Sequence, residues 1–195
     1  MGIIFPISLI LLIVVIVAFR QSAGLWSNLI MLGNTVVAAL VATNYFEPLA
    51  TKLSGMLAAL GMYADFVALW VLFAATVFAL KIATDSVSRY VVRFPKVVEL
   101  AGNYVALLAL GWVVVCFTAM SIHTAPLSRE PFAGGMKPEQ ANFFGFAPDR
   151  LWLGFAQRTS QGALAGGNVF DPNGDLTLRY AARRELFDRP EPKKP

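Results

Sequence analysis

Residues 25–46 read LWSNLIMLGNTVVAALVATNYF, a run of apolar and small polar side chains without a charge. As an α-helix this run would measure about 33 Å, at roughly 1.5 Å per residue. The hydrocarbon core of a bilayer is about 30 Å thick, so the run is long enough to cross it. Trp26 and Tyr45 stand near its two ends, where aromatic rings prefer the membrane interface. The run therefore predicts a membrane-spanning helix.

Three further apolar segments flank this run at residues 3–19, 63–83 and 100–122. Each is close to the length of about 20 residues that a spanning helix needs. The first segment lacks the basic start and the small cleavage residues of a signal peptide, so we expect it to remain as a span. Pro48 and a leucine-rich face after it predict a short interfacial helix over about 48–60.

Composition supports the same class of protein. Of the 195 residues, 57% are apolar and 14% charged, and the mean hydropathy is +0.62. Soluble domains carry about 25% charged residues, so disorder and most soluble enzymes are excluded. We expect an all-α integral membrane protein with four transmembrane helices, a short interfacial helix and a mostly irregular C-terminal tail. Its expected partner is the lipid bilayer, and the net charge of +4 is too dispersed to predict nucleic-acid binding.

The chain divides into a four-helix membrane domain at 1–127 and a polar tail at 128–195. Within the tail we expect a short helix over about 148–157 and a turn over 171–175. Residues 176–180 alternate like a short strand, residues 181–187 are equally compatible with a helix, and residues 190–195 are expected to be disordered.

The distribution of basic residues predicts the orientation of the chain. On one side of the membrane, the basic residues near the span ends are Arg20, Lys81, Arg89, Arg93 and Lys96. On the other side they are Lys52, Arg129 and Lys137. Cytoplasmic loops carry the excess of Lys and Arg. We therefore expect the cytoplasmic (inner) membrane, crossed several times, with both termini extracytoplasmic.

The chemistry-bearing residues predict no catalytic, cofactor-binding or metal site. The chain has one Cys and one His, and it lacks a glycine-rich phosphate loop. Asp171, Asn173 and Asp175 have calcium-loop spacing, but Leu176 replaces the required Gly, so a turn is favoured. His123 has no acidic neighbour in the sequence. We expect the protein not to be an enzyme.

Two groups of residues remain as candidate contacts. Asn34 and Thr35 lie near the middle of span two and could bond another helix, and Asp85 and Arg89 are spaced to pair at the rim. The tail concentrates large apolar side chains, which are Phe143, Phe144, Phe146, Leu151, Trp152 and Phe155. We expect the Leu151–Trp152–Phe155 face to dock on the outer end of the bundle or on a second protein. That protein would be a membrane or envelope protein, or another copy of the chain. Adhesion to the membrane is the alternative.

Residues 1–127 resemble the colicin V production protein family. The resemblance rests on FRQSAGLWSNLIMLGN (19–34), NYFEPLA (44–50), DFVALWVLFA (65–74), DSVSRYVVRFP (85–95) and HTAPL (123–127). Family members often carry an Asp in the first span, and this chain has no acidic residue there. In family members, a charged pair often precedes a Gly-rich start of the fourth span. In this chain that region reads VVELAGNY (97–104).

The resemblance implies an inner-membrane protein without an established chemical activity. Its implied role is toxin production or export and envelope maintenance, with the tail as an interaction surface. The alternative is a small transporter or channel subunit. Ionisable residues in the middle of the membrane would be expected of that alternative, and the predicted spans place none there.

Overall fold

The computed structural model describes residues 3–88, 92, 94–127, 132, 136, 143–162 and 169–188. The described part of the chain contains helices, turns and irregular segments, and no strand. Its helices are α1 (Ile4–Arg20), η1 (Gln21–Ala23), α2 (Leu25–Met56), η2 (Ala58–Tyr63), α3 (Ala64–Val87), α4 (Lys96–Thr124), α6 (Pro148–Gln161) and α7 (Leu176–Asp188).

Four of these helices are long and apolar enough to cross a bilayer. They cover Ile4–Ala23, Leu25–Met56, Leu60–Val87 and Lys96–Thr124, with mean hydropathies between 1.7 and 2.4. The longest, α2, has 32 residues and therefore measures about 48 Å. It extends beyond a hydrocarbon core of about 30 Å at one end or both. The protein is an all-α membrane protein with four spans, as the hydropathy pattern predicts.

The prediction of a separate interfacial helix over 48–60 is wrong in its boundaries. Helix α2 continues through Pro48 to Met56, and the chain breaks at Leu57 before η2. A proline inside a helix forfeits one backbone hydrogen bond. Phe46 and Ala50, on either side of Pro48, are buried in the core, so packing holds the helix through the proline. The turn instead uses Gly61, whose φ of +38° suits glycine.

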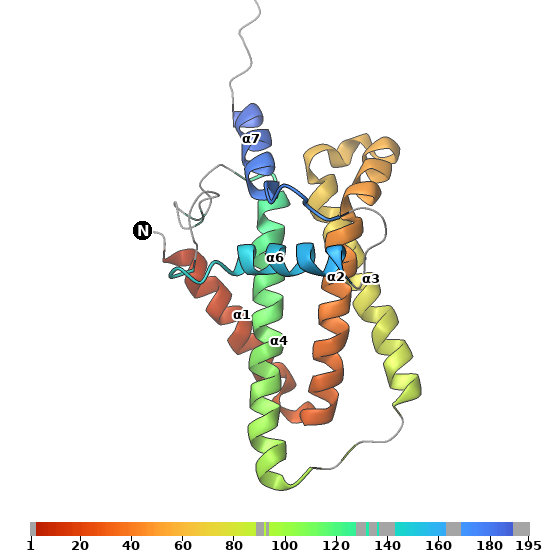
Figure 1. Ribbon diagram of the computed structural model, residues 1–195, viewed down its shortest axis with the longest axis vertical. Helices are drawn as coiled ribbons and strands as arrows, with labels where there is room; N and C mark the ends of the chain where they lie inside the picture. The colour runs from red at the N-terminus through yellow and green to blue at the C-terminus, as the bar shows by residue number, and fades with distance from the viewer. Residues whose placement is uncertain are drawn as a thin grey trace, which may run out of the picture.

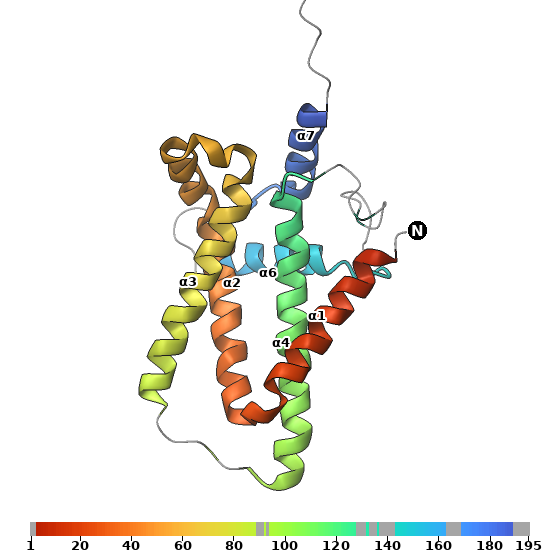
Figure 2. The same cartoon turned by 180° about the vertical axis from the view of Figure 1, so that it is seen from behind.

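The spans form a bundle in which α2 packs against both α3 and α4, and α1 packs against α4 (Figure 1). Figure 2 shows α1 and α3 on one face of this bundle, while α6 crosses α2 and α4 on the opposite face. Helix α6 crosses α2 at Thr43. The part of α2 between Leu25 and Thr43 is about 27 Å long, so α6 lies almost one hydrocarbon thickness from the other end of the bundle.

An aromatic cluster fills the bundle near the level of α6. Phe117 of α4 stacks on Phe73 at 4.6 Å between ring centroids, and Trp70 meets Phe117 edge-on at 5.4 Å. Trp152 of α6 completes the cluster at 6.1 Å from Phe117. Edge-to-face and offset ring pairs at these distances stabilise a core beyond their buried area. Helices α3 and α4 and the tail therefore share one core, to which α2 adds small and apolar side chains such as Ala42 and Phe46.

Two side-chain amides and the carboxylate of Glu99 fasten the opposite end of the bundle. Asn28 donates to the side-chain oxygen of Asn103 at 2.7 Å, and Asn103 donates to the backbone carbonyl of Gln21 at 2.9 Å. The backbone N–H of Leu25 donates to Glu99 at 2.7 Å. These bonds tie the tight α1–α2 connection to the start of α4, in a region where buried polar groups need partners.

Candidate functional site

Helix α6 is amphipathic, and its inner face closes on the bundle. Asp149, Trp152, Ala156 and Ser160 recur at intervals of three or four residues and are buried. Of the three residues predicted to dock, only Trp152 points inward. Leu151 and Phe155 are 53% and 43% exposed. The docked face is therefore rotated from the predicted one, because polar Asp149 and Ser160, and not the apolar pair, line the contact.

Trp152 anchors α6 through both its ring and its nitrogen. The indole N–H donates to the hydroxyl of Thr43 at 2.9 Å, and the ring packs on Phe117. Thr43 donates in turn to the carbonyl of Ala39 at 2.7 Å. A buried indole N–H usually has such a partner, so this hydrogen bond adds a directional contact to the packing of the ring.

A buried histidine–carboxylate pair lies beside this anchor. Nε2 of His123, in the last turn of α4, is 2.9 Å from Oδ2 of Asp149, in the first turn of α6. The two side chains are 1% and 2% exposed. Nδ1 of His123 and Oδ1 of Asp149 have no hydrogen-bond partner among the described residues. Among the described residues, each side chain thus has the other as its one side-chain hydrogen-bond partner.

Sequence reasoning missed this pair because Asp149 follows His123 by 26 positions. One signal was present. Asp149 directly follows Pro148 at a helix start, where a carboxylate interacts favourably with the helix dipole. A lone histidine at the end of a span requires a polar partner when it is buried. The pair joins the end of α4 to the start of α6.

The segment before α7 forms the expected turn, and Asp171 caps the helix. Its carboxylate accepts from the backbone N–H groups of Asp175 at 3.1 Å and Leu176 at 3.2 Å. Gly174 closes the turn with a bond to the carbonyl of Asp171 at 3.0 Å. The strand suggested for 176–180 is wrong, because this capped start makes residues 176–188 one helix. The predicted disorder at 190–195 concerns residues outside the described ranges.

Charged side chains of α7 reach the ends of α2 and α3. Arg183 pairs with Asp65 at the start of α3. Arg179 lies 3.6 Å from Glu47 of α2 and 3.0 Å from Asp175. Burial, followed by the negative charges of Asp65 and Glu47, raises the pKa of the Tyr180 phenol above its ordinary value. Two arginines of the tail thus neutralise acids that the spans present at this end.

The polar residues predicted to make contacts within the bundle have different kinds of hydrogen-bond partner. Asn34 donates to the hydroxyl of Thr84 at 3.0 Å, which joins α2 to α3. Thr35 is buried but donates to the carbonyl of Met31 within α2. Asp85 pairs with Lys81, and the predicted partner Arg89 lies outside the described residues.

The phenylalanines before α6 divide between the bundle and the surface. Phe143 is buried against Trp112, with ring centroids 5.9 Å apart. Phe144 and Phe146 are 68% and 64% exposed. Leu151 and Phe155, which follow in α6, are exposed as well.

No protein-family model, curated protein or solved structure matches the chain.

Proposed function

We propose that this chain is a non-catalytic, multi-pass protein of the cytoplasmic membrane whose docked tail binds another membrane or envelope protein. The role that its resemblance implies is toxin production or export and envelope maintenance. One observation carries the proposal. Helix α6 is already docked through Trp152 and Asp149, yet it still presents Leu151 and Phe155 to the outside.

We call the four exposed large apolar side chains of α6 and the turn before it the outward apolar surface; they are Phe144, Phe146, Leu151 and Phe155. Covering one such side chain is worth about 1.5–3 kcal/mol, so the surface has a strong tendency to be covered. Exposed apolar surfaces of this kind mark interaction sites. Aromatic residues are also the side chains enriched where proteins bind one another.

Backbone geometry favours a protein partner over simple adhesion. Phe143, Phe144 and Ala147 adopt left-handed conformations, with φ of 57°, 54° and 45°. This conformation costs roughly 1–2 kcal/mol per non-glycine residue. Insertion of phenylalanine into lipid requires no particular backbone shape, whereas a fitted protein contact does. Strained residues of this kind cluster at functional sites.

The arrangement of basic residues supports a tail outside the cytoplasm. Arg20 ends α1, Lys81 lies near the end of α3, and Lys96 begins α4. These helix ends share the lower end of the bundle in Figure 1, away from α6 and α7. By the positive-inside rule that end faces the cytoplasm.

A labelling experiment tests this orientation. Asn173 is exposed in the turn before α7, so Asn173→Cys in a Cys116→Ala background should react with a membrane-impermeant maleimide in intact cells. Labelling that requires permeabilised cells would reverse the orientation.

The alternative function, a small transporter or channel subunit, is less well supported. Such a protein needs polar groups along its path. The described contacts place Asn34 with Thr84 toward one end and Asp65 with Arg183 at the other. Between these ends the core contains the rings of Trp70, Phe73, Phe117 and Trp152.

Site-specific photo-crosslinking tests the proposed partner surface. p-Benzoylphenylalanine at Phe155 should capture a protein in intact cells, and the same photoprobe at exposed Asn173 serves as the control. A crosslinked species of twice the mass would identify a second copy of the chain as the partner. Capture of lipid alone at Phe155, or equal capture of protein at Phe155 and Asn173, would show that the surface only adheres to the membrane.

A genetic experiment tests the implied role separately. Loss of the gene should lower secretion of a peptide toxin and weaken the envelope against detergent. The full chain should restore both, and the chain truncated after Gln140 should restore neither. Full complementation by the truncated chain would remove the tail from the proposed function.

A further inference from the structure

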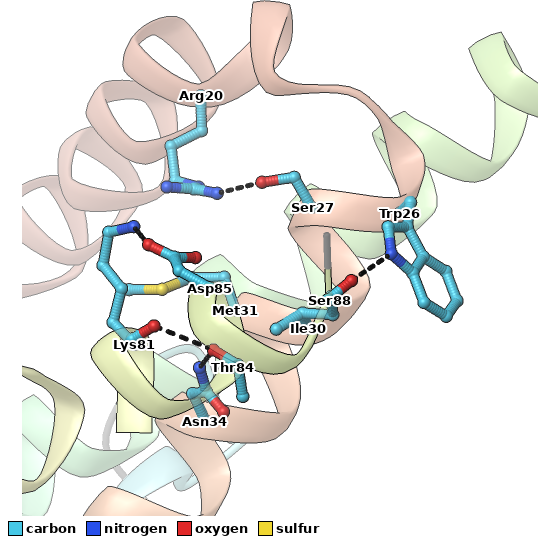
Figure 3. Close-up of a pocket in the computed structure, with 10 residues that line it drawn as sticks. All are labelled: Arg20, Trp26, Ser27, Ile30, Met31, Asn34, Lys81, Thr84, Asp85 and Ser88. Carbon is cyan, nitrogen blue, oxygen red and sulfur yellow. Dashed lines mark hydrogen bonds and ion pairs between the residues drawn. The ribbon is translucent and has the colours of Figure 1, made fainter. Parts of the chain in front are cut away.

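A polar pocket lies between the spans at the end of the bundle opposite the tail. It has a volume of about 230 Å³ and is formed by the end of α1, the start of α2 and the end of α3 (Figure 3). Arg20, Ser27, Lys81 and Ser88 line it, with Asp85 beside Lys81. None of these residues takes part in the tail contacts described above, so the pocket requires an explanation of its own.

The pocket carries an excess of positive charge. Asp85 pairs with Lys81 and neutralises one of the two cations. Arg20 donates to the side chains of Asn28 at 2.9 Å and Ser27 at 3.4 Å, both of which are neutral. It forms no ion pair with a carboxylate of the described residues. A guanidinium has five N–H donors, so Arg20 retains donors and a full charge for an anion.

Further donors surround these cations. The hydroxyls of Ser27 and Ser88 accept from Arg20 and from the indole N–H of Trp26. Their own hydrogens have no acceptor in the described part of the chain. Lys81 uses one of its ammonium hydrogens on Asp85. The pocket therefore offers several donors to a ligand, a pattern that fits the oxygens of a phosphate group.

The location indicates where such a phosphate would come from. Arg20, Lys81 and Ser88 lie at or near the ends of their spanning segments, which is the depth of lipid headgroups. Trp26 flanks the pocket, as aromatic residues do at the membrane interface. On α3, Phe78 and Ile82 are exposed within one turn of Lys81 and offer an apolar surface for acyl chains. A free phosphate would make no use of this surface.

We propose that this pocket binds the phosphate-bearing headgroup of an anionic phospholipid. Arg20 and Lys81 contact the phosphate, the two serine hydroxyls donate to its oxygens, and the acyl chains lie along α3. Basic pockets between spans on the cytoplasmic side are suited to such headgroups. The net positive charge makes an anionic lipid bind more tightly than a zwitterionic one.

Native mass spectrometry of the full chain in detergent tests the proposal. The lipids are phosphatidylglycerol and phosphatidylcholine, and inorganic phosphate is the competitor. Lys81→Gln should weaken phosphatidylglycerol binding about fivefold, since one Lys near the surface contributes roughly that factor. Asp85→Asn should strengthen binding by a similar factor. Both side chains are more than half exposed, so both variants should fold, and Lys52→Gln at the other end is the matched control.

Three results would overturn the proposal. The first is equal binding of the two lipids by the wild-type chain. The second is a failure of Lys81→Gln and Asp85→Asn to shift binding in opposite directions relative to Lys52→Gln. The third is complete displacement of phosphatidylglycerol by millimolar inorganic phosphate, which would assign the pocket to free phosphate.

Discussion

Removing one member of the His123–Asp149 pair should release α6 from the bundle. In Asp149→Ala, the imidazole of His123 stays at the level of the core and loses its one described hydrogen bond. An unsatisfied buried polar group costs about 1–3 kcal/mol, and more where a bond to a charged group is lost. Both side chains are almost fully buried, so we expect a loss of docking free energy of about 3 kcal/mol.

Hydrogen–deuterium exchange of the full chain in detergent measures this loss directly. A loss of 3 kcal/mol increases the opening equilibrium about 150-fold. Amides in the peptide Pro148–Gln161 should therefore exchange faster by about that factor, provided that closing is faster than exchange. Asp85→Ala is the matched control, because it removes an exposed carboxylate at the other end of the bundle. It should leave exchange in α6 unchanged.

A double-mutant cycle separates the pair from general damage. His123→Leu with Asp149→Leu removes both polar groups, so the double variant should dock better than either single variant. The reasoning would be refuted by single variants whose α6 amides exchange within twofold of the wild type. The reasoning would also be refuted if the losses of docking free energy in the two single variants add up to the loss in the double variant, because independent sites show no coupling.

Three further outcomes are expected. Trp152→Phe should cost α6 docking about 1 kcal/mol through the lost indole bond, and Trp152→Ala about 3–5 kcal/mol, both measured by the same exchange assay. Gly102→Ala would place a methyl group 2.8 Å from a methyl carbon of Leu25, whereas Gly33 has no neighbour within 4 Å; only the first substitution should lower the thermal unfolding midpoint, by the equivalent of about 1–3 kcal/mol. Because burial and two neighbouring carboxylates raise the pKa of Tyr180, α7 docking should lose stability as the pH rises above about 10, where the undocked phenol ionises. Tyr180→Phe should abolish that alkaline loss in exchange measured against pH, and an unchanged alkaline profile in this variant would contradict the assignment.

The spans were predictable because hydropathy is a local property of the chain. The run from Leu25 to Phe46 needs no partner to be recognised as a helix that crosses lipid. The end of α2 was not predictable in the same way. Pro48 is a local signal for a helix start, but the burial of Phe46 and Ala50 in the core overrides it. Packing between distant segments is the information that a local pattern lacks.

The contacts of the tail show the same limit. Large apolar side chains pointed to α6, and Trp152 is indeed buried. The rotation of the helix could not be inferred, because it depends on His123 and Thr43, which lie on two different spans. Pairings between residues far apart in sequence leave no spacing that a pattern could detect.

The contacts at the two ends of the bundle join different elements, and this determines which parts can separate. At one end, neutral amide bonds between Asn28 and Asn103 join the spans to one another. At the other end, Asp149 and Arg183 join the tail to the spans. About 22 Å of helix α2 lies between Asn28 and Thr43, where α6 crosses it, and the described contacts place the tail residues only in the second set. Loss of the His123–Asp149 pair should therefore free α6 while the α1–α2 connection stays closed. Exchange at the amides of residues 21–28 should then match the wild type in the same samples in which α6 opens, and faster exchange there would show that the tail and the spans unfold as one unit.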